Sequence, residues 1–454
     1  MLDENGNLVN TQHDLSVAVA SYFENIFKDP KSTNIVDQLN VIHHFLRLFS
    51  VEDNRSLSRP VSLVEIEEIL KKCAKDKSPC PEGCPVEFYL GFWDIMGNDI
   101  LQLVEESRVS GSISGALNST FIALIPKKSK PVGFDEYRPI SLCNFLYKII
   151  SKIIVERIKP FLSGIISMEQ FGFIPQRQIL DVGLAQEGIH SIKTKHLPAS
   201  LLELDLVKAY DKIYWAFLRL LLIHIGLDHC MVSWIMACVE RVNFSVLVNG
   251  APTCFFKSHH GLRQGCPLYP LLFILVMDGL SRMIDRAKRG GTIQGVLISP
   301  SIYLSHVLFV DYVLLMGASS PEEWSKFFDI ITSFCGATGM EMSRNKSCFI
   351  ATKGIIEQSI RDLFPIEVIP LEKGFKYLGF ILKLNCYRFH DWVWLWDRFD
   401  RKIGLWSYWY LSLGGRLTLA KSALESISVY WLSLFKVSKA ILIGLRKRVT
   451  AFIW

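Results

Sequence analysis

The alternation of hydrophobic and polar residues predicts a mixture of helices and strands. Apolar residues recur at helical spacing in SLVEIEEILKKCAKDKSP, which predicts a helix ending at Pro79, and again over 141–162, 212–224, 266–289 and 321–339. Short apolar or alternating runs predict strands over 121–128, 201–206 and 243–250. The segment HVLFVDYVLLMG, residues 306–317, predicts two apolar strands joined by a turn. This order of elements favours an α+β fold with an antiparallel hairpin at its centre.

Two aspartates stand at the ends of apolar strands. Asp205 follows LLEL, and Asp311 lies in the turn of the 306–317 hairpin. An ionised carboxylate is costly to bury alone, so strand-end carboxylates are candidates for holding a divalent ion. On spacing alone, the commoner interpretation is that Asp205 caps a strand end and that Asp311 makes a turn.

Composition narrows the class of protein. Half of the 454 residues are hydrophobic and 21% are charged, which favours two or three domains with a large core and disfavours disorder. No apolar run reaches the roughly 20 residues that a membrane helix needs, and the start MLDENGNLVN shows no secretory signal. The 11 dispersed cysteines predict reduced, intracellular thiols. Cys80 and Cys84 are close, but no second Cys/His pair follows at zinc spacing.

The net charge of +6 is small, but the basic residues are clustered. From Asp397 to Arg448 there are ten Lys/Arg against three acids. A second cluster comprises Lys127, Lys128, Lys130 and Arg138, followed by Lys148, Lys152, Arg157 and Lys159. Two basic surfaces around an acidic centre would suit a polyanion held over a metal site. Solvated helix faces are an equally good interpretation of the clusters alone.

Ten segments, read in order, resemble the reverse transcriptase of non-LTR (long interspersed element) retrotransposons, particularly those of plants. Ahead of the polymerase core stands KDKSPCPEGCPVEFYLGFW, and the finger motifs are FIALIPKK, EYRPISLCNFLYKIISKII and EQFGFIPQRQILD. Motifs A to E are LELDLVKAYDKIYW, HGLRQGCPLYPLLF, LFVDYVLLMG, TGMEMSRNKS and FKYLGFIL, and LSLGGRLTLAKSALESISVYWLSLFKV resembles the thumb. The resemblance runs collinearly from about residue 75 to 454, which makes it far more specific than any single motif.

The resemblance implies a right-hand polymerase whose antiparallel palm sheet carries the metal site. We expect residues 1–104 to form an N-terminal linker or extension, 105–384 the fingers and palm, and 385–454 a truncated, basic, helical thumb. The implied reaction is RNA-templated DNA synthesis, with an RNA template, a DNA primer and deoxynucleotide triphosphates as partners, no membrane, and two Mg²⁺ or Mn²⁺ ions. The implied location is nuclear. Nothing resembles the family's upstream endonuclease or a cysteine/histidine knuckle, so we expect the middle of a polyprotein.

The resemblance also implies roles for particular residues. Asp205 and Asp311 match the metal-binding aspartates, with the Leu206 carbonyl as an extra ligand. The aromatic that favours deoxynucleotides is matched by Tyr210, whereas Asp211 is expected to be structural. The remaining matches are Lys127 and Arg138 near the triphosphate, Gln264 and Gly265 at the nascent base pair, and Lys346 as the residue that protonates pyrophosphate. A buried structural ion pair for the finger residues, and a plain surface charge for Lys346, remain alternatives.

Several positions depart from the family pattern. Tyr312 stands where motif C has a second aspartate, and a phenol with a pKa of about 10 is neutral at pH 7 and a poor ligand for a hard cation. Motif B has Cys266 for aspartate and Tyr269 for serine, and the upstream segment has Cys80 for glycine and Glu82 for aspartate. These changes predict a degenerate copy with weak or no activity. The alternatives are a catalytically dead nucleic-acid-binding module and an unexpressed or unstable pseudogene product.

Two further expectations concern the tertiary structure. If the fold is a polymerase palm, the Asp205 and Asp311 carboxylates should lie near one another, and Lys127 and Arg138 should face them across a cleft. In the basic C-terminal region, Arg446, Lys447 and Arg448 are expected to contact the phosphates of a duplex.

Overall fold

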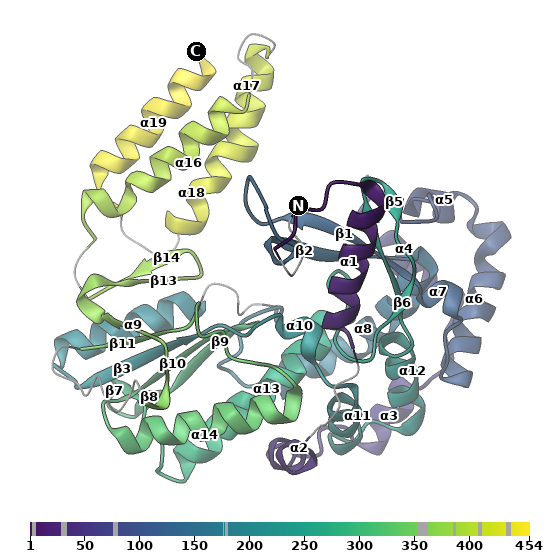
Figure 1. Cartoon of the computed structure of the whole chain (residues 1–454), viewed down its shortest axis with the longest axis horizontal. Helices are drawn as coiled ribbons and strands as arrows, with labels where there is room; N and C mark the ends of the chain where they lie inside the picture. Colours follow the sequence, from purple (N-terminus) through teal and green to yellow (C-terminus); the bar gives the residue numbers. More distant parts are fainter. Residues whose placement is uncertain are drawn as a thin grey trace.

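A computed structural model describes the chain except for residues 2–5, 29–33, 76–79, 176, 178–179, 353–361, 385–386, 407–410 and 433–436. Its helices and strands form the three parts of a right hand (Figure 1). One mixed sheet with its helices makes the palm, a second sheet with surrounding helices makes the fingers, and the C-terminal helices stand above the palm as a thumb. Within the described residues, none of the helices is both long and apolar enough to cross a bilayer.

The palm sheet has the order β12-β11-β3-β10-β9. Its strands are β3 (Ala199–Leu204), β9 (His306–Phe309), β10 (Tyr312–Ala318), β11 (Cys348–Ala351) and β12 (Glu367–Pro370). β3 runs antiparallel to both β10 and β11, β9 and β10 form a hairpin, and β12 is parallel to β11. Alternate residues enter opposite cores, as strand geometry requires: Leu202 and Leu204 join one core, whereas Leu201 joins the other.

Helices cover both faces of the palm sheet. One core contains α13 (Tyr269–Arg289) and α14 (Pro321–Thr338), and the opposite core contains α9 (Leu180–Thr194). The chain between β3 and α13 adds α10 (Ala209–Lys212), α11 (Trp215–His224) and α12 (His229–Val239). A small hairpin of β7 (Val296–Ser299) and β8 (Ile302–Leu304) precedes β9.

The fingers are built on a sheet of order β2-β1-β4-β5, with β6 also paired to β4. The strands are β1 (Thr120–Pro126), β2 (Tyr137–Cys143), β4 (Asn243–Val248), β5 (Ala251–Pro252) and β6 (Phe256–Lys257). A 3₁₀ turn, η1 (Phe134–Glu136), leads into β2, and α8 (Phe145–Ile165) follows it. The described residues before this sheet form the helices α1 (Gln12–Ile26), α2 (Ile35–Ile42), α3 (Val51–Leu57), α4 (Leu63–Lys71), α5 (Val86–Gly91), α6 (Trp93–Ser110) and α7 (Gly115–Asn118).

The thumb follows a hairpin of β13 (Phe375–Tyr377) and β14 (Phe380–Leu382). The turns η2 (Leu371–Lys373) and η3 (Phe389–Trp392) flank this hairpin. The thumb helices are α16 (Val393–Gly404), α17 (Leu413–Leu419), the π-helical turn η5 (Ala420–Leu424), α18 (Glu425–Leu432) and α19 (Lys439–Ile453). Leu395, Phe399 and Ile441 bury their side chains between these helices in the core that also covers one face of the palm sheet.

Most elements predicted from the hydrophobic pattern are confirmed, with two corrections. The helix predicted over 141–162 begins only at Phe145, because residues 137–143 pair with β1 as strand β2 and Asn144 caps the helix by accepting from the Leu146 amide. The helix predicted to end at Pro79 ends at Lys71, and part of the KDKSP segment lies outside the described residues.

Candidate active site

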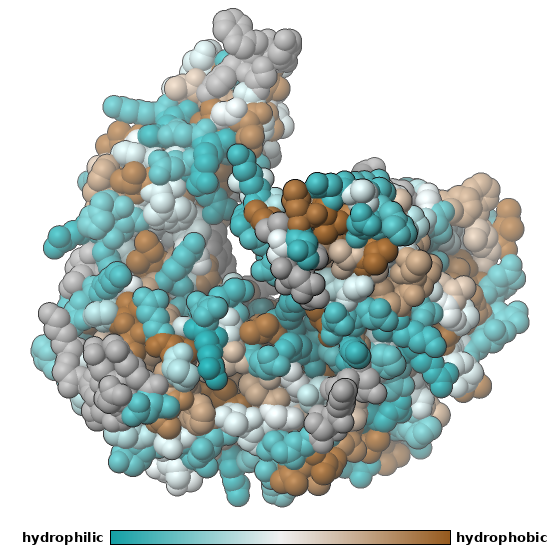
Figure 2. All heavy atoms as spheres, viewed as in Figure 1, coloured by the Kyte–Doolittle hydropathy of each residue, from teal (hydrophilic) through white to brown (hydrophobic). Residues whose placement is uncertain are grey.

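Sheet register brings the two predicted metal-binding aspartates to one end of the palm. Leu204 of β3 pairs with Val313 of β10, so Asp205 and Tyr312 follow at the same end of neighbouring strands. Asp311 lies in the turn immediately before Tyr312. Figure 2 shows this face of the molecule hollowed between the thumb and the fingers. Residues more than 100 positions apart in the sequence therefore share one site.

A turn from the next strand holds the backbone of Asp205. The Ser343 amide donates to the Asp205 carbonyl at 2.8 Å, and the Asp205 amide donates to the Ser347 hydroxyl at 3.0 Å. The Leu206 carbonyl takes no part in these bonds. Lys346 lies in the same turn with an exposed side chain, and its charge acts on both Asp205 and Asp311. The hydrogen bonds between the end of β3 and the turn before β11 therefore bring Asp205 and Lys346 close together.

The turn that carries Asp311 has strained backbone geometry and its own support. Val310 has φ of 59°, which a β-branched residue rarely adopts. Its amide donates to Oε1 of Gln170 at 3.1 Å, and the same oxygen accepts from the Gly172 amide at 3.0 Å. The QFGF stretch of the third finger motif thus fixes the direction of Asp311.

The carboxylates at this site are electrostatically coupled. Burial raises the pKa of Asp205 and of Asp311, and the charge of Asp205 raises the pKa of Asp311 further, while Lys346 opposes both shifts. Glu203, which our sequence analysis missed, lies two residues before Asp205 on the same face of β3. Burial, assisted by Asp205, raises the pKa of Glu203 to about 7. The ELD alternation within a strand was the available signal for it.

Tyr312 contributes a neutral oxygen beside these acids. Its side chain is 41% exposed, and burial together with Asp311 and Asp205 raises its pKa. The phenol therefore stays protonated at neutral pH. Asp205 and Asp311, with the Leu206 carbonyl beside them, are oxygen donors that fit a divalent cation, and such an ion would relieve the repulsion between the two acids. Tyr312 adds no negative charge to this set.

The β1–β2 hairpin of the fingers presents the two predicted cations. Arg138 pairs across the hairpin with Ile125, and its charge lowers the pKa of Asp311. The Lys127 ammonium donates to the Asp135 carbonyl at 2.7 Å. Burial and the nearby charge of Lys346 lower the pKa of Lys127. Arg138 and Lys346 therefore both act on Asp311, whereas Lys127 lies near Lys346, Asp135 and Asp211.

Residues of motif A and motif B pack against the palm and the fingers. The ring of Tyr210 stacks on Phe273 with centroids 4.0 Å apart, and burial followed by the charge of Asp311 raises its pKa. Gly265 has φ of +111°, and a Cβ there would lie 2.9 Å from the Ser141 carbonyl oxygen. The Ser141 amide donates to the Gln264 carbonyl at 2.7 Å, which joins the motif B loop to β2. Asp211 lies next to His260, because its backbone carbonyl oxygen is 2.8 Å from Nδ1 of His260. Burial raises the pKa of the Asp211 carboxyl to about 6.

A buried arginine anchors the motif B loop despite the two substitutions in that motif. Arg263 donates from Nε to the Tyr269 hydroxyl at 2.9 Å, and from its other nitrogens to Asn118, Thr120 and the Cys238 carbonyl. All five of its N–H groups therefore have acceptors. Burial raises the pKa of Cys266, but hydrogen bonds from Cys143 and Tyr147 and the charge of Arg263 outweigh this effect and lower it. Tyr269 thus supplies a polar partner of the guanidinium, and the Cys266 side chain lies close enough for the charge of Arg263 to act on it.

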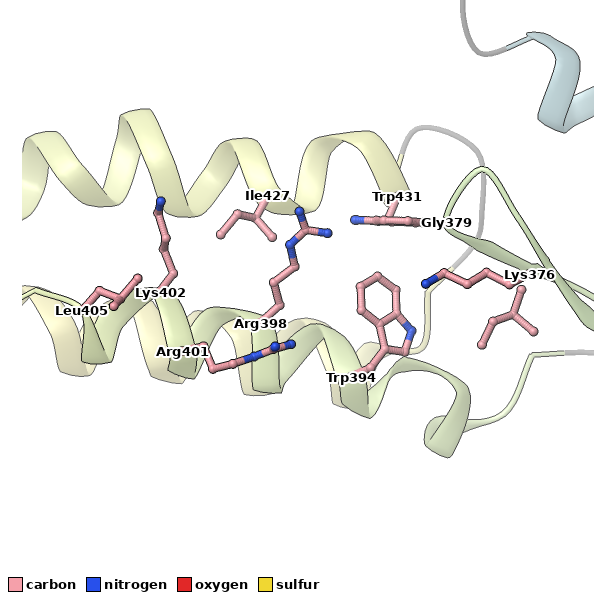
Figure 3. A pocket seen from close by; sticks show the side chains of 10 residues that line it. Lys376, Gly379, Trp394, Arg398, Arg401, Lys402, Leu405, Ile427 and Trp431 are labelled. Atoms are coloured by element: carbon pink, nitrogen blue, oxygen red, sulfur yellow. The ribbon is translucent and has the colours of Figure 1, made fainter. Parts of the chain in front are cut away.

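The thumb contains a basic cavity of about 770 Å³ between α16, α18 and the β13–β14 hairpin. Figure 3 shows side chains of both helices directed into it. Lys376, Arg398, Arg401 and Lys402 line it together with Trp394, and none of the described lining residues is acidic. By contrast, Arg448 on α19 already pairs with Asp400 at 2.9 Å and lies over the Trp396 ring.

Comparison with known proteins yields one family and several relatives. Residues 125–382 match the family described as reverse transcriptase (RNA-dependent DNA polymerase). The chain is 24% identical over 460 residues to the uncharacterized 149 kDa protein of transposon TX1 from Xenopus laevis, an alignment covering 99% of this chain and 34% of that protein. It is 22% identical over 309 residues to the retrovirus-related Pol polyprotein of a type-2 retrotransposable element from Drosophila melanogaster, covering 67% of this chain and 28% of the relative. It is 26% identical over 201 residues to the retrovirus-related Pol polyprotein of a type-1 retrotransposable element from Popillia japonica, covering 42% of this chain and 32% of the relative. The chain spans about a third of the length of these relatives.

Proposed function

The chain belongs to the reverse transcriptase family, within the enzymes of non-LTR retrotransposons, and we propose that it binds a primer–template but synthesises DNA weakly or not at all. The observation that carries this proposal is Tyr312, a neutral side chain beside Asp205 and Asp311 at the end of the palm sheet. Reverse transcriptases generally use divalent metal ions, and Mg²⁺ is our proposal for this chain.

The residues around the two aspartates support a nucleotidyltransferase site. Bound divalent ions would stabilise the attacking and leaving oxygens of an in-line displacement. We assign Arg138 and Lys127 to binding of the triphosphate, and Lys346 to protonation of the leaving pyrophosphate. Tyr210 would exclude a 2′-hydroxyl, while Gln264 and Gly265 would meet the nascent base pair. An RNA template, a DNA primer and deoxynucleotide triphosphates are the proposed partners, and a nuclear location is proposed from the family alone.

A primer-extension assay with Mg²⁺ and with Mn²⁺ tests the proposed reaction. Extension above an Asp205→Ala control would establish a residual enzyme. Salt-sensitive RNA binding without extension would instead support a nucleic-acid-binding module, which the basic thumb cavity favours as the second candidate function. Failure to obtain cooperatively folding protein would favour a pseudogene product.

Restoring the missing carboxylate provides the sharpest test of the Tyr312 interpretation. Loss of one metal ligand forfeits about 3–4 kcal/mol of transition-state stabilisation, or roughly 10²–10³ in rate, so Tyr312→Asp should raise primer extension by a large part of that factor. The matched comparison adds Cys266→Asp and Tyr269→Ser to the same variant. Rescue by the single change locates the defect at the metal site, and rescue only by the triple change extends it to motif B. If both variants fold and bind RNA but neither extends a primer, Tyr312 is not the decisive lesion.

A further inference from the structure

Three metal-ligating side chains converge on the palm away from the candidate active site. Glu169 lies beside β9, Asp285 is on α13, and His306 is the first residue of β9. One carboxylate oxygen from each acid and one imidazole nitrogen all lie within 4.8 Å of one another. We propose that Glu169, Asp285 and His306 form a second cation site, which binds a first-row transition ion such as Zn²⁺.

The imidazole of His306 is held ready to act as a ligand. Its side chain is fully buried, with Nε2 2.7 Å from the Ser281 hydroxyl and Nδ1 3.0 Å from the Ser305 hydroxyl. Burial lowers its pKa to about 3, so the ring is neutral at any physiological pH. Metal-bound histidines need this neutral form and are commonly oriented by a hydrogen bond from the second nitrogen. Either serine can keep that orienting role while the other nitrogen binds the ion.

The two acids lie where a cation would stabilise them. Burial raises the pKa of Asp285 to about 6, and the charge of Glu169 adds to that rise. The ammonium of Lys288, whose charge opposes the rise in the pKa of Asp285, also donates to the Tyr303 carbonyl at 2.6 Å. Both acids are only half-buried, so an ion can reach them from solvent. A bound cation would replace the repulsion between two carboxylates with attraction to both.

The donor set favours a transition ion over Mg²⁺. Imidazole with carboxylates suits Zn²⁺, whereas Mg²⁺ prefers oxygen ligands throughout. When Zn²⁺ is bound tetrahedrally with bonds of about 2.0–2.1 Å, its ligand atoms stand about 3.3 Å apart. The ligand atoms of Glu169, Asp285 and His306, which lie within 4.8 Å of one another, must therefore move closer together to bind the ion. Rotation of the two half-buried carboxylate side chains can provide that contraction, while His306 stays fixed in the core.

An ion here would brace the hairpin that carries Asp311. Two backbone hydrogen bonds join the segment of Glu169 to β9. The Leu308 amide donates to the Glu169 carbonyl at 2.8 Å, and the Phe171 amide donates to the Leu308 carbonyl at 2.9 Å. The next residue in that segment is Gln170, which supports Val310. Because a strand rises about 3.3 Å per residue, His306 and Phe309, the last residue of β9 before the turn, stand roughly 10 Å apart. The proposed ion is thus a separate site from the one at Asp205 and Asp311, and its binding can be measured without polymerase activity.

Zinc binding is tested in a background that lacks the active-site acids. In an Asp205→Asn/Asp311→Asn variant, Zn²⁺ should be retained at one ion per chain after dialysis and should raise Tm by at least about 2 °C, whereas Mg²⁺ should not. Adding Asp285→Asn or Glu169→Gln should weaken zinc binding at least about ten-fold and remove the Tm increase. His306 is left unchanged, because its serine contacts lie in the core.

The matched control is Asp329→Asn, which neutralises an exposed acid on α14 and should leave zinc binding unchanged. Zinc binding that survives Asp285→Asn and Glu169→Gln would overturn the proposal, because the ion would then occupy another group. Absence of any zinc-dependent Tm increase in the folded background variant would overturn it equally.

Discussion

At the scale of single residues, departures from a family motif differ in their consequences. At the candidate metal site, Tyr312 is a neutral residue where the family motif has a negatively charged one. Among the described neighbours, the half-buried Glu203 on β3 is the one acid that could replace that charge. Cys266 and Tyr269 instead form new contacts with Arg263. Glu82, which replaces an aspartate, still accepts a hydrogen bond from the Phe145 amide at the start of α8. A substitution in a motif therefore predicts a loss of activity only when no neighbouring side chain can replace the missing functional group.

The bond between Arg263 and Tyr269 should be worth a measurable part of the stability. Tyr269→Phe removes the hydroxyl that accepts from the buried Nε–H of Arg263 and should lower the free energy of unfolding by about 1–3 kcal/mol, measured by denaturant titration. Tyr137→Phe is the matched control, since the Tyr137 hydroxyl makes only a long contact with the Met1 sulfur at 3.8 Å. Equal effects of the two substitutions would show that Tyr269 does not anchor motif B.

At the scale of elements, the motif C hairpin depends on a close approach between two chain segments. A Cβ placed on Gly172 would lie 2.8 Å from the Val310 amide nitrogen and closer still to the Val310 side chain. Glycine at this position therefore allows the QFGF stretch to support the turn before Asp311. The finger motif and motif C act as one structural unit.

Substitution of Gly172 should disturb that unit. Gly172→Ala is expected to cost roughly 1–3 kcal/mol of unfolding free energy through overpacking, and to move the turn that carries Asp311. Gly183→Ala on α9 is the matched control, because nothing lies within 4 Å of a Cβ there and alanine favours a helix. Hydrogen exchange of the Val310 and Tyr312 amides would report the displacement. Unchanged exchange and stability in Gly172→Ala would contradict the tight approach.

The thumb helices differ in how available their cations are. Arg398, Arg401 and Lys402 are exposed along α16 at the basic cavity, whereas Arg448 of α19 is bonded to Asp400. The sequence predicts phosphate contacts from Arg446, Lys447 and Arg448, whereas the exposed cations of α16 favour that helix as the stronger phosphate surface. The two helices of the thumb can therefore be compared directly.

Neutralising α16 should flatten the salt dependence of nucleic-acid binding. The Arg398→Gln/Arg401→Gln/Lys402→Gln variant should reduce the slope of log K against log salt by up to about three units. The Arg446→Gln/Lys447→Gln/Arg448→Gln variant should reduce it by no more than about two, because Arg448 already has an acidic partner. Binding to an RNA/DNA duplex across a salt series measures both slopes. A larger loss from the α19 variant would exclude α16 as the principal phosphate surface.

At the scale of the whole molecule, one hydrophobic core joins helices α2 to α6 and α8 to the palm. Val41, Ile42 and Phe45, from α2 and the turn after it, pack in the same cluster as Phe273 of α13. We expected residues 1–104 to be a linker or extension, and the division of the chain at 104 and 384 stays a prediction. The helices before residue 104 nevertheless contribute directly to the core that supports the palm.

A shared core predicts shared unfolding. Val41→Ala, at a fully buried position on α2, should lower the unfolding free energy by roughly 1–3 kcal/mol, and Val276→Ala on α13 should move the same transition. Thermal unfolding followed by circular dichroism and by hydrogen exchange of β3 would test this. Val64→Ala, at an exposed position of α4, serves as the control with little effect. A separate early transition in Val41→Ala alone would show that the N-terminal helices unfold independently.

The sequence by itself determined the local elements and the candidates for the reacting groups. Hydrophobic periodicity located the strand before Asp205 and the hairpin around Asp311, because burial on one or two faces leaves a direct trace in residue order. The motif order then predicted the right-hand fold, which is confirmed.

Only the tertiary structure decided which distant side chains meet. Sheet register placed Asp205 beside the turn that carries Asp311, and packing placed Tyr269 against Arg263 and Gln170 under Val310. It also turned residues 137–143 into a strand, because pairing with β1 outweighed the helical pattern that continues into α8. Such contacts depend on strand pairing and helix packing between segments far apart in the chain, and the local pattern carries no record of them.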